Sequence, residues 1–217
     1  MTKLRQSPEA VVMVRPHYFS PNPETEKDNA FQQSTELSLN QVNRQAYNEV
    51  NNAIDILTSH GVAVHVFDDK SIETPDSVFP NNWFTTHEDG AVAIYPMYCQ
   101  NRRKEINFDI IDFLASKYVV NRIVDYSSYA EQGQFLEGTG AMVLDHDNSI
   151  AYAVNSNRMS EEMLNNFAQD FTYTPIIFNA SDDNGTPVYH TNVLMCVASG
   201  FAMICLDMIK DSTEQAQ

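Results

Sequence analysis

The stretch EGTGAMVLDHDNSIAYAV, residues 137–154, determines how the rest of the chain is interpreted. It begins with a carboxylate and two glycines, enters an apolar run, turns at a polar segment and returns in a second apolar run. Two apolar runs on either side of a polar turn predict a β-hairpin. The stretches NNWFTTHEDGAVAIY (81–95) and HTNVLMCVASGFAMIC (190–205) repeat the arrangement, with an amide pair or a histidine at the start. The sequence therefore predicts three equivalent hairpins, each led by a polar residue.

Between the hairpins, apolar residues recur with helical spacing, and short apolar runs follow. The repeating order is strand, strand, helix, strand, with a period of roughly 50–60 residues, which is typical of repeated or radial folds. The chain holds about three and a half such units, so we expect an α/β fold of repeated modules, with residues 1–217 forming one domain that lacks its C-terminal module or modules. The expected helices cover 39–57, 103–117 and 160–170, and the expected strands outside the hairpins cover 10–14, 62–67, 122–124 and 175–178.

Composition limits the classes of partner. The 217 residues carry a formal net charge of −16, with 13 basic against 29 acidic side chains. Nucleic acid and anionic membranes are therefore not expected as partners, because both require clustered Lys and Arg. No segment approaches the ~20 apolar residues of a membrane span, and the N-terminus lacks the apolar stretch of a signal peptide, so we expect a cytoplasmic protein.

The three cysteines are Cys99, Cys196 and Cys205. They are odd in number and lack the spacing of metal ligands, so no structural metal is expected. Cys196 and Cys205 lie in apolar strand runs, which predicts buried free thiols rather than nucleophiles.

Polar residues at the starts of the hairpins are candidates for one site. If the hairpins are equivalent modules around an axis, then Asn81, Asn82, Glu137 and His190 converge. A histidine beside an orienting carboxylate is suited to general acid–base catalysis. Asp76 and the amides would accept hydrogen bonds from a planar group with several donors, such as guanidinium or urea. The same residues would also serve as Asx turns, strand caps or a structural histidine, and both interpretations stay open.

Two further features are candidates for substrate contacts. The pair Arg102-Arg103 opens a helical stretch, and Arg158 lies at the corresponding place one unit later, in a chain that is poor in arginine. Either side chain would bind a carboxylate through two hydrogen bonds, or would be an ordinary surface residue. The polar stretch 20–33 predicts a long loop of the kind that often covers a site.

Five motifs resemble, in order, those of one superfamily: MVRP (13–16), PDSVFPNNWF (75–84), NRRKE (101–105), LEGTG (136–140) and YHTN (189–192). From about residue 11 to 210 the chain resembles the guanidine-modifying (pentein) superfamily. It looks most like the amidinotransferase-related branch, which includes arginine dihydrolases and citrulline hydrolases.

This resemblance implies a five-bladed α/β propeller of strand-strand-helix-strand modules and a C–N hydrolase acting on arginine or citrulline. A Cys nucleophile would attack the guanidinium or ureido carbon, and water would release the covalent intermediate. His190 would shuttle protons, Glu137 would orient the substrate nitrogens, and Asp76 would bind the side-chain or α-amino end. The resemblance implies no metal or organic cofactor and leaves open a homo-oligomer. The further substrate contacts that it implies are Phe79, Asn81, Asn82, the α-carboxylate ligands Arg103 and Arg158, and the loop residues Asn22 and Asn29.

The sequence departs from this pattern twice. Related dimethylarginine hydrolases carry acidic residues where this chain has Asn81 and Asn82, and two amides do not neutralise a guanidinium. The amides therefore favour citrulline hydrolysis, or two-step hydrolysis of arginine to ornithine. The nucleophile belongs near the start of a hairpin in the last module, and none of the three cysteines matches. We therefore expect residues 1–217 to be inactive alone.

Three alternatives remain open at this stage. The first is a catalytically silent protein that binds arginine or citrulline. The second is an amidinotransferase, because the acceptor is chosen by the shape of the pocket. The third is an interaction domain in which the motifs are turns and caps.

Overall fold

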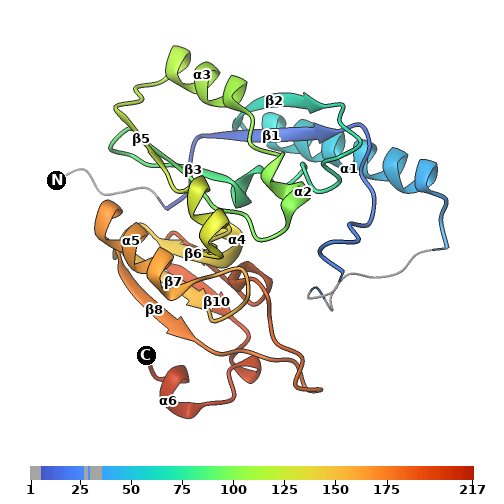
Figure 1. The fold of residues 1–217 in the computed structure, drawn as a ribbon. Coiled ribbons are helices and arrows are strands. Elements are labelled where there is room, and N and C mark those ends of the chain that lie inside the picture. Colours follow the sequence, from blue (N-terminus) through green and yellow to red (C-terminus); the bar gives the residue numbers. More distant parts are fainter. Residues whose placement is uncertain (1–5, 27–28, 30–35) are drawn as a thin grey trace. The chain divides into compact units, whose positions relative to one another are not determined.

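The structure, a computed structural model, describes residues 6–26, 29 and 36–217. The chain forms two compact units, and its elements are labelled in Figure 1. Unit 1 comprises residues 6–7, Asn81–Tyr98 and Val120–Gln217, and unit 2 comprises the described parts of Pro8–Pro80 together with Cys99–Val119.

Unit 2 is built on two parallel strands joined by a long helix. Strand β1 (Ala10–Pro16) pairs in parallel with β2 (Ala63–Asp69), and α1 (Leu39–Ser59) connects them. Gly61 adopts a φ of +84° after the helix, a conformation that glycine adopts without steric cost and that suits the end of a helix.

The single helix expected over 103–117 was wrong. The structure has α2 (Gln100–Arg103) and α3 (Phe108–Lys117) instead. The break occurs because Asn107 caps α3: its side-chain oxygen accepts a hydrogen bond from the backbone N–H of Asp109 at 2.9 Å.

Unit 1 contains the three predicted hairpins, and in two of them a third strand pairs in parallel with the second strand of the hairpin. Strand β4 pairs antiparallel with β3 and parallel with β5, and β7 pairs antiparallel with β6 and parallel with β8. The chain between β7 and β8 forms α5 (Glu161–Phe171), whose acidic first turn suits the helix dipole. The strands are β3 (Phe84–Thr86), β4 (Ala91–Ile94), β5 (Arg122–Asp125), β6 (Met142–Asp145), β7 (Ile150–Val154), β8 (Thr174–Phe178), β9 (Met195–Ala198) and β10 (Phe201–Ile204).

Short helical turns connect these strands. Two of them, α4 and η3, each follow a predicted site residue directly. The turns are η1 (Pro80–Asn82), η2 (Ser127–Gln132), α4 (Gly138–Ala141), η3 (Thr191–Val193), η4 (Leu206–Met208) and α6 (Ser212–Gln215).

The core of unit 1 lies between α5 and the sheets. Met163, Leu164 and Phe167 of α5 are fully buried against residues of β4, β6 and β7. Aromatic rings extend this core, because Phe167 stacks on Phe171 with ring centroids 4.9 Å apart. Burial of these apolar side chains is the main stabilising contribution to the unit.

The prediction that Cys196 and Cys205 are buried was wrong. Cys99 is buried, whereas Cys196 and Cys205 are exposed. All four residues of β10 are exposed, and in the described chain β10 pairs with β9 alone. An apolar strand run predicts burial only when another layer covers it, and no described residues cover this one.

Candidate functional site

Glu137 and His190 are brought together in unit 1. Glu137 precedes α4 and His190 precedes η3, and the two side chains meet although 53 residues separate them in sequence. The His190 Nε2 and Glu137 Oε2 atoms are 2.8 Å apart, and the side chains are 6% and 0% exposed. The hydrogen bond to the carboxylate fixes the orientation of the imidazole ring, and such an arrangement is suited to general acid–base chemistry.

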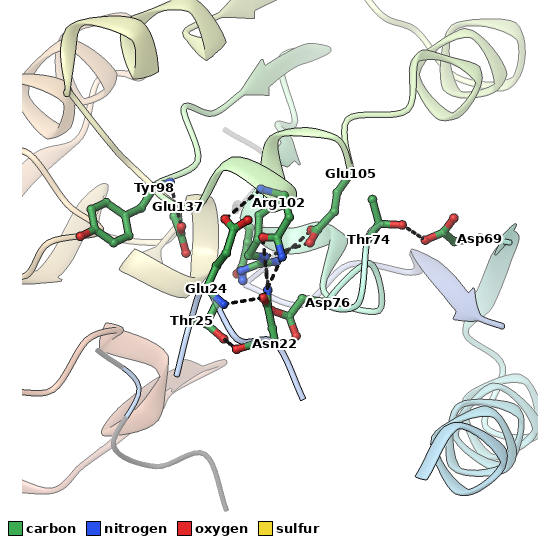
Figure 2. A network of polar contacts seen from close by, with 12 residues as sticks. Asn22, Glu24, Thr25, Asp69, Thr74, Asp76, Tyr98, Arg102, Glu105 and Glu137 are labelled. Atoms are coloured by element: carbon green, nitrogen blue, oxygen red, sulfur yellow. Dashed lines mark hydrogen bonds and ion pairs between the residues drawn. The ribbon is translucent and has the colours of Figure 1, made fainter. Parts of the chain in front are cut away.

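The carboxylate of Glu137 has further donors. Its Oε1 accepts a hydrogen bond from the backbone N–H of Tyr98 at 3.0 Å, drawn as a dashed line in Figure 2. Its Oε2 lies 3.2 Å from Nη1 of Arg158, whose side chain is 2% exposed. These donors favour the ionised form of the carboxylate, which is otherwise costly to bury.

Two glycines allow the amides to approach the histidine. A Cβ at Gly140 would lie 2.7 and 2.8 Å from two His190 ring atoms and under 3.0 Å from the Asn82 side-chain oxygen. Gly138 has a φ of +41°, and a Cβ there would collide with the backbone oxygen of Asn81. These glycines therefore permit close approach, and the Asn82 amide lies beside the imidazole.

The backbone next to His190 is fixed by a buried hydroxyl. Thr191, which is 0% exposed, donates its hydroxyl to the carbonyl of Ala141 at 2.5 Å and accepts from the backbone N–H of Val154 at 2.8 Å. These bonds connect η3 to α4 and β7. Thr191 was not predicted to belong to the site, although a threonine directly after a candidate catalytic histidine is a usable signal.

A second polar cluster lies within unit 2 and is shown in Figure 2. Asn22, which is 1% exposed, donates to Asp76 Oδ2 at 2.7 Å and accepts from the Asn101 amide at 2.7 Å. Arg102 binds Glu105 through two hydrogen bonds of 3.0 Å, and its Nε is 3.9 Å from Asp76. Asp76 therefore faces an amide and a guanidinium.

The predicted site residues thus fall into two groups. Unit 1 brings together Asn81, Asn82, Glu137, Arg158 and His190, and unit 2 brings together Asn22 and Asp76. The remaining three lie in unit 2. Phe79 is 44% exposed, and Arg103 ends α2 and is half-buried. Asn29 donates its backbone N–H to the carbonyl of Thr25.

Two residues of the unit 2 cluster, Asn101 and Glu105, were missed, although they lie in the NRRKE motif. Arg102 was considered together with Arg103 as a ligand of a carboxylate, and the carboxylate that it binds is that of Glu105. The spacing of Arg102 and Glu105, three residues apart, would have predicted their ion pair.

No helix among residues 6–26, 29 and 36–217 is long and apolar enough to cross a membrane. Over the same residues, no three His, Cys, Asp or Glu side chains gather as metal ligands.

Comparison with solved structures shows the fold. The substrate-bound N-terminal domain of ArgZ, an arginine dihydrolase from the ornithine-ammonia cycle in cyanobacteria, matches with a TM-score of 0.68 and 15% identity, over 95% of this chain and 70% of that one. AgrE in complex with L-arginine matches with a TM-score of 0.69 and 16% identity, over 95% and 29% of the two chains. A dimethylarginine dimethylaminohydrolase adduct matches with a TM-score of 0.65 and 11% identity, over 95% and 73%.

Comparison with sequences shows the family. No curated protein matches the chain. The family model of N,N dimethylarginine dimethylhydrolase, eukaryotic, matches residues 15–217, which is nearly the whole chain. The observed α/β fold agrees with this match, and so do the structural matches. The chain therefore belongs to the eukaryotic N,N dimethylarginine dimethylhydrolase family, within the guanidine-modifying (pentein) superfamily.

Proposed function

We propose that this chain is part of a C–N hydrolase that acts on the guanidine or ureido group of arginine or citrulline. The observation that carries the proposal is the buried pair of His190 and Glu137, whose facing atoms are 2.8 Å apart, in a member of this family. A buried acid–base pair is costly unless it is fully bonded, so its presence favours a catalytic role over a capping role.

The proposed architecture is a propeller of strand-strand-helix-strand modules in one catalytic domain. Its support is the shared order of β3-β4-β5 and β6-β7-β8, in which the second strand of each hairpin pairs in parallel with the strand that follows a helix.

The proposed mechanism is covalent catalysis by a cysteine outside residues 1–217. The thiolate would attack the guanidinium or ureido carbon, and the C–N bond to the leaving amine would break. His190 would protonate this amine and then remove a proton from the attacking water. Glu137 would fix the imidazole through its hydrogen bond and orient the substrate nitrogens.

The proposed substrate contacts lie in both units. Asp76 would bind the side-chain or α-amino end of the amino acid, beside Phe79. Arg103 and Arg158 would hold the α-carboxylate. Asn22 and Asn29, from the polar stretch 20–33, would also contact the bound amino acid. The hydrogen bond between Asn22 and Asp76 supports this proposal for Asn22.

The amides set the proposed substrate preference. The side-chain nitrogen of Asn81 donates to the side-chain oxygen of Asn82 at 3.0 Å, and Asn82 lies beside the His190 ring. A neutral pair suits a neutral ureido group better than a guanidinium, because a buried cation requires a countercharge. Replacing Asn82→Asp is expected to shift the ratio of kcat/KM values from citrulline toward arginine, and an unchanged ratio would contradict this preference.

One observation favours a second candidate, a catalytically silent arginine- or citrulline-binding protein. Cys196 and Cys205 are exposed in unit 1, Cys99 is buried in unit 2, and none leads a hairpin. An amidinotransferase is a variant of the first candidate and differs only in the acceptor amine.

The test is turnover by the longest natural polypeptide that contains this chain. Ammonia, citrulline and ornithine are measured after incubation with arginine or citrulline, alongside His190→Gln and Glu137→Gln. We expect turnover that each substitution lowers by at least a hundredfold. Binding of either amino acid by calorimetry without turnover would favour the silent protein, and formation of an amidino-amine from added glycine would favour the transferase.

A further inference from the structure

The residues Glu137 and Arg158 are connected through both their backbones and their side chains. The backbone N–H of Glu137 donates to the carbonyl of Arg158 at 3.1 Å, and the neighbouring residues Leu136 and Met159 form an antiparallel bridge. The side chains then meet again, with Arg158 Nη1 at 3.2 Å from Glu137 Oε2. A backbone contact and a side-chain contact therefore both fix the position of the Glu137 carboxylate.

The same guanidinium reaches the segment that carries His190. The central carbon of the Arg158 guanidinium lies 4.9 Å from the centre of the Tyr189 ring, a distance typical of cation–π contacts. The Tyr189 ring centre is in turn 4.7 Å from that of His190. Ser156 supports this arrangement, because its hydroxyl accepts from the Arg158 backbone N–H and donates to the Tyr189 carbonyl.

Burial makes the charge of Arg158 important to Glu137. The two side chains are 2% and 0% exposed, so water does not screen the pair. A buried carboxylate without a cation takes up a proton or destabilises the fold. Tyr98, His190 and Arg158 all contact this carboxylate, and of these three Arg158 is the residue that is positively charged at every physiological pH.

We infer that Arg158 is a positioning residue for Glu137: it keeps the carboxylate ionised and aimed at Nε2 of His190. This role is additional to the α-carboxylate contact proposed above, because it acts on the chemical step, whereas the α-carboxylate contact concerns only the far end of the substrate. The catalytic consequence rests on the proposed function, whereas the ion pair does not.

The ion pair is tested by unfolding, without any assay of activity. Melting temperatures are measured for the native polypeptide, for Arg158→Gln, for Glu137→Gln and for the double variant. We expect Arg158→Gln to melt well below the double variant, because the single substitution leaves an uncompensated buried carboxylate. A double variant that melts no higher than Arg158→Gln overturns the inference, and this comparison holds even when Arg158→Gln is largely unfolded.

An exposed ion pair of unit 1 provides the matched control. Arg122 and Asp89 are 3.2 Å apart, with side chains 43% and 57% exposed. The same cycle with Arg122→Gln and Asp89→Asn is expected to show additive shifts, because water screens that pair.

The catalytic role is tested with arginine and with agmatine, which is arginine without its carboxylate. A positioning residue acts on the chemical step, so Arg158→Gln is expected to lower kcat by at least tenfold for both compounds, and Arg158→Lys to recover part of the loss. An effect confined to KM for arginine, with agmatine unchanged, assigns Arg158 to the α-carboxylate and overturns the positioning role. If the wild type converts neither of these compounds nor citrulline, the proposed function fails, and the unfolding cycle still decides whether the pair exists.

Discussion

Replacing His87→Phe should remove part of the acid sensitivity of the fold. His87 follows β3, and its ring lies 4.1 Å from that of Phe171 in the aromatic core of unit 1. Its Nε2 is 2.9 Å from the hydroxyl of Thr85, which also bonds the Tyr95 hydroxyl. Phenylalanine keeps the ring contact, and the Thr85 hydroxyl keeps its bond to Tyr95, so the substitution removes mainly the titrating nitrogen.

The magnitude follows from the pKa of His87. Burial lowers this pKa from 6.5 to about 4, with further lowering by His146 and Arg122 that outweighs the opposing effect of Asp89. Between pH 6.5 and 4 the unfolded chain therefore binds a proton that the folded chain does not, so the free energy of unfolding falls as the pH falls through this window. At about 1.4 kcal/mol for each pKa unit, the loss is about 3 kcal/mol, and it is complete below pH 4.

The assay is urea unfolding between pH 7.5 and 4, followed by the fluorescence of Trp83, which is the single tryptophan of the chain and is 1% exposed. We expect His87→Phe to lose about 3 kcal/mol less than the wild type across this range. His60→Phe, at the exposed end of α1, is the control and should follow the wild type. Parallel pH profiles for wild type and His87→Phe would refute the argument, because they would mean that His87 titrates alike in both states.

Three further substitutions probe the two polar clusters. Gly140→Ala should lower turnover by about 100-fold with an unchanged circular dichroism spectrum, because its Cβ displaces His190; full activity would contradict the close approach. Thr191→Val should lower the free energy of unfolding by about 2–4 kcal/mol, because it leaves the buried N–H of Val154 and the buried carbonyl of Ala141 without this hydroxyl. Thr191→Ser keeps the hydroxyl and should show most of the wild-type free energy of unfolding in the same urea titration. Arg102→Gln should cost about 3 kcal/mol because it leaves the buried Glu105 without its cation, whereas a thermal melt unchanged from wild type would count against that pair.

The sequence predicted the local elements better than their surroundings. The three hairpins were predicted because apolar runs and polar turns are local signals. The meeting of Glu137 and His190 was predicted only because the two residues occupy like positions in successive repeats.

Burial and polar partners were harder to predict, because they depend on residues that are distant in sequence. Cys196 lies in an apolar run and is nevertheless exposed, since described residues pack against Met195 and Val197 on the other side of β9. Arg158 was expected to contact the substrate, and no pattern indicated that its guanidinium would lie beside Glu137. The helix break at Asn107 depended on a single capping side chain, which apolar spacing does not report.

The partners of Glu137 also have a consequence for folding kinetics. The Tyr98 amide, the Arg158 guanidinium and the His190 imidazole lie 39, 21 and 53 residues from it along the chain. Contacts between distant residues form only after the intervening chain has been ordered, so they are expected to be largely absent from the folding transition state. Weakening them should therefore accelerate unfolding and leave the folding rate nearly unchanged, which makes the site a reporter of the last step toward the native structure.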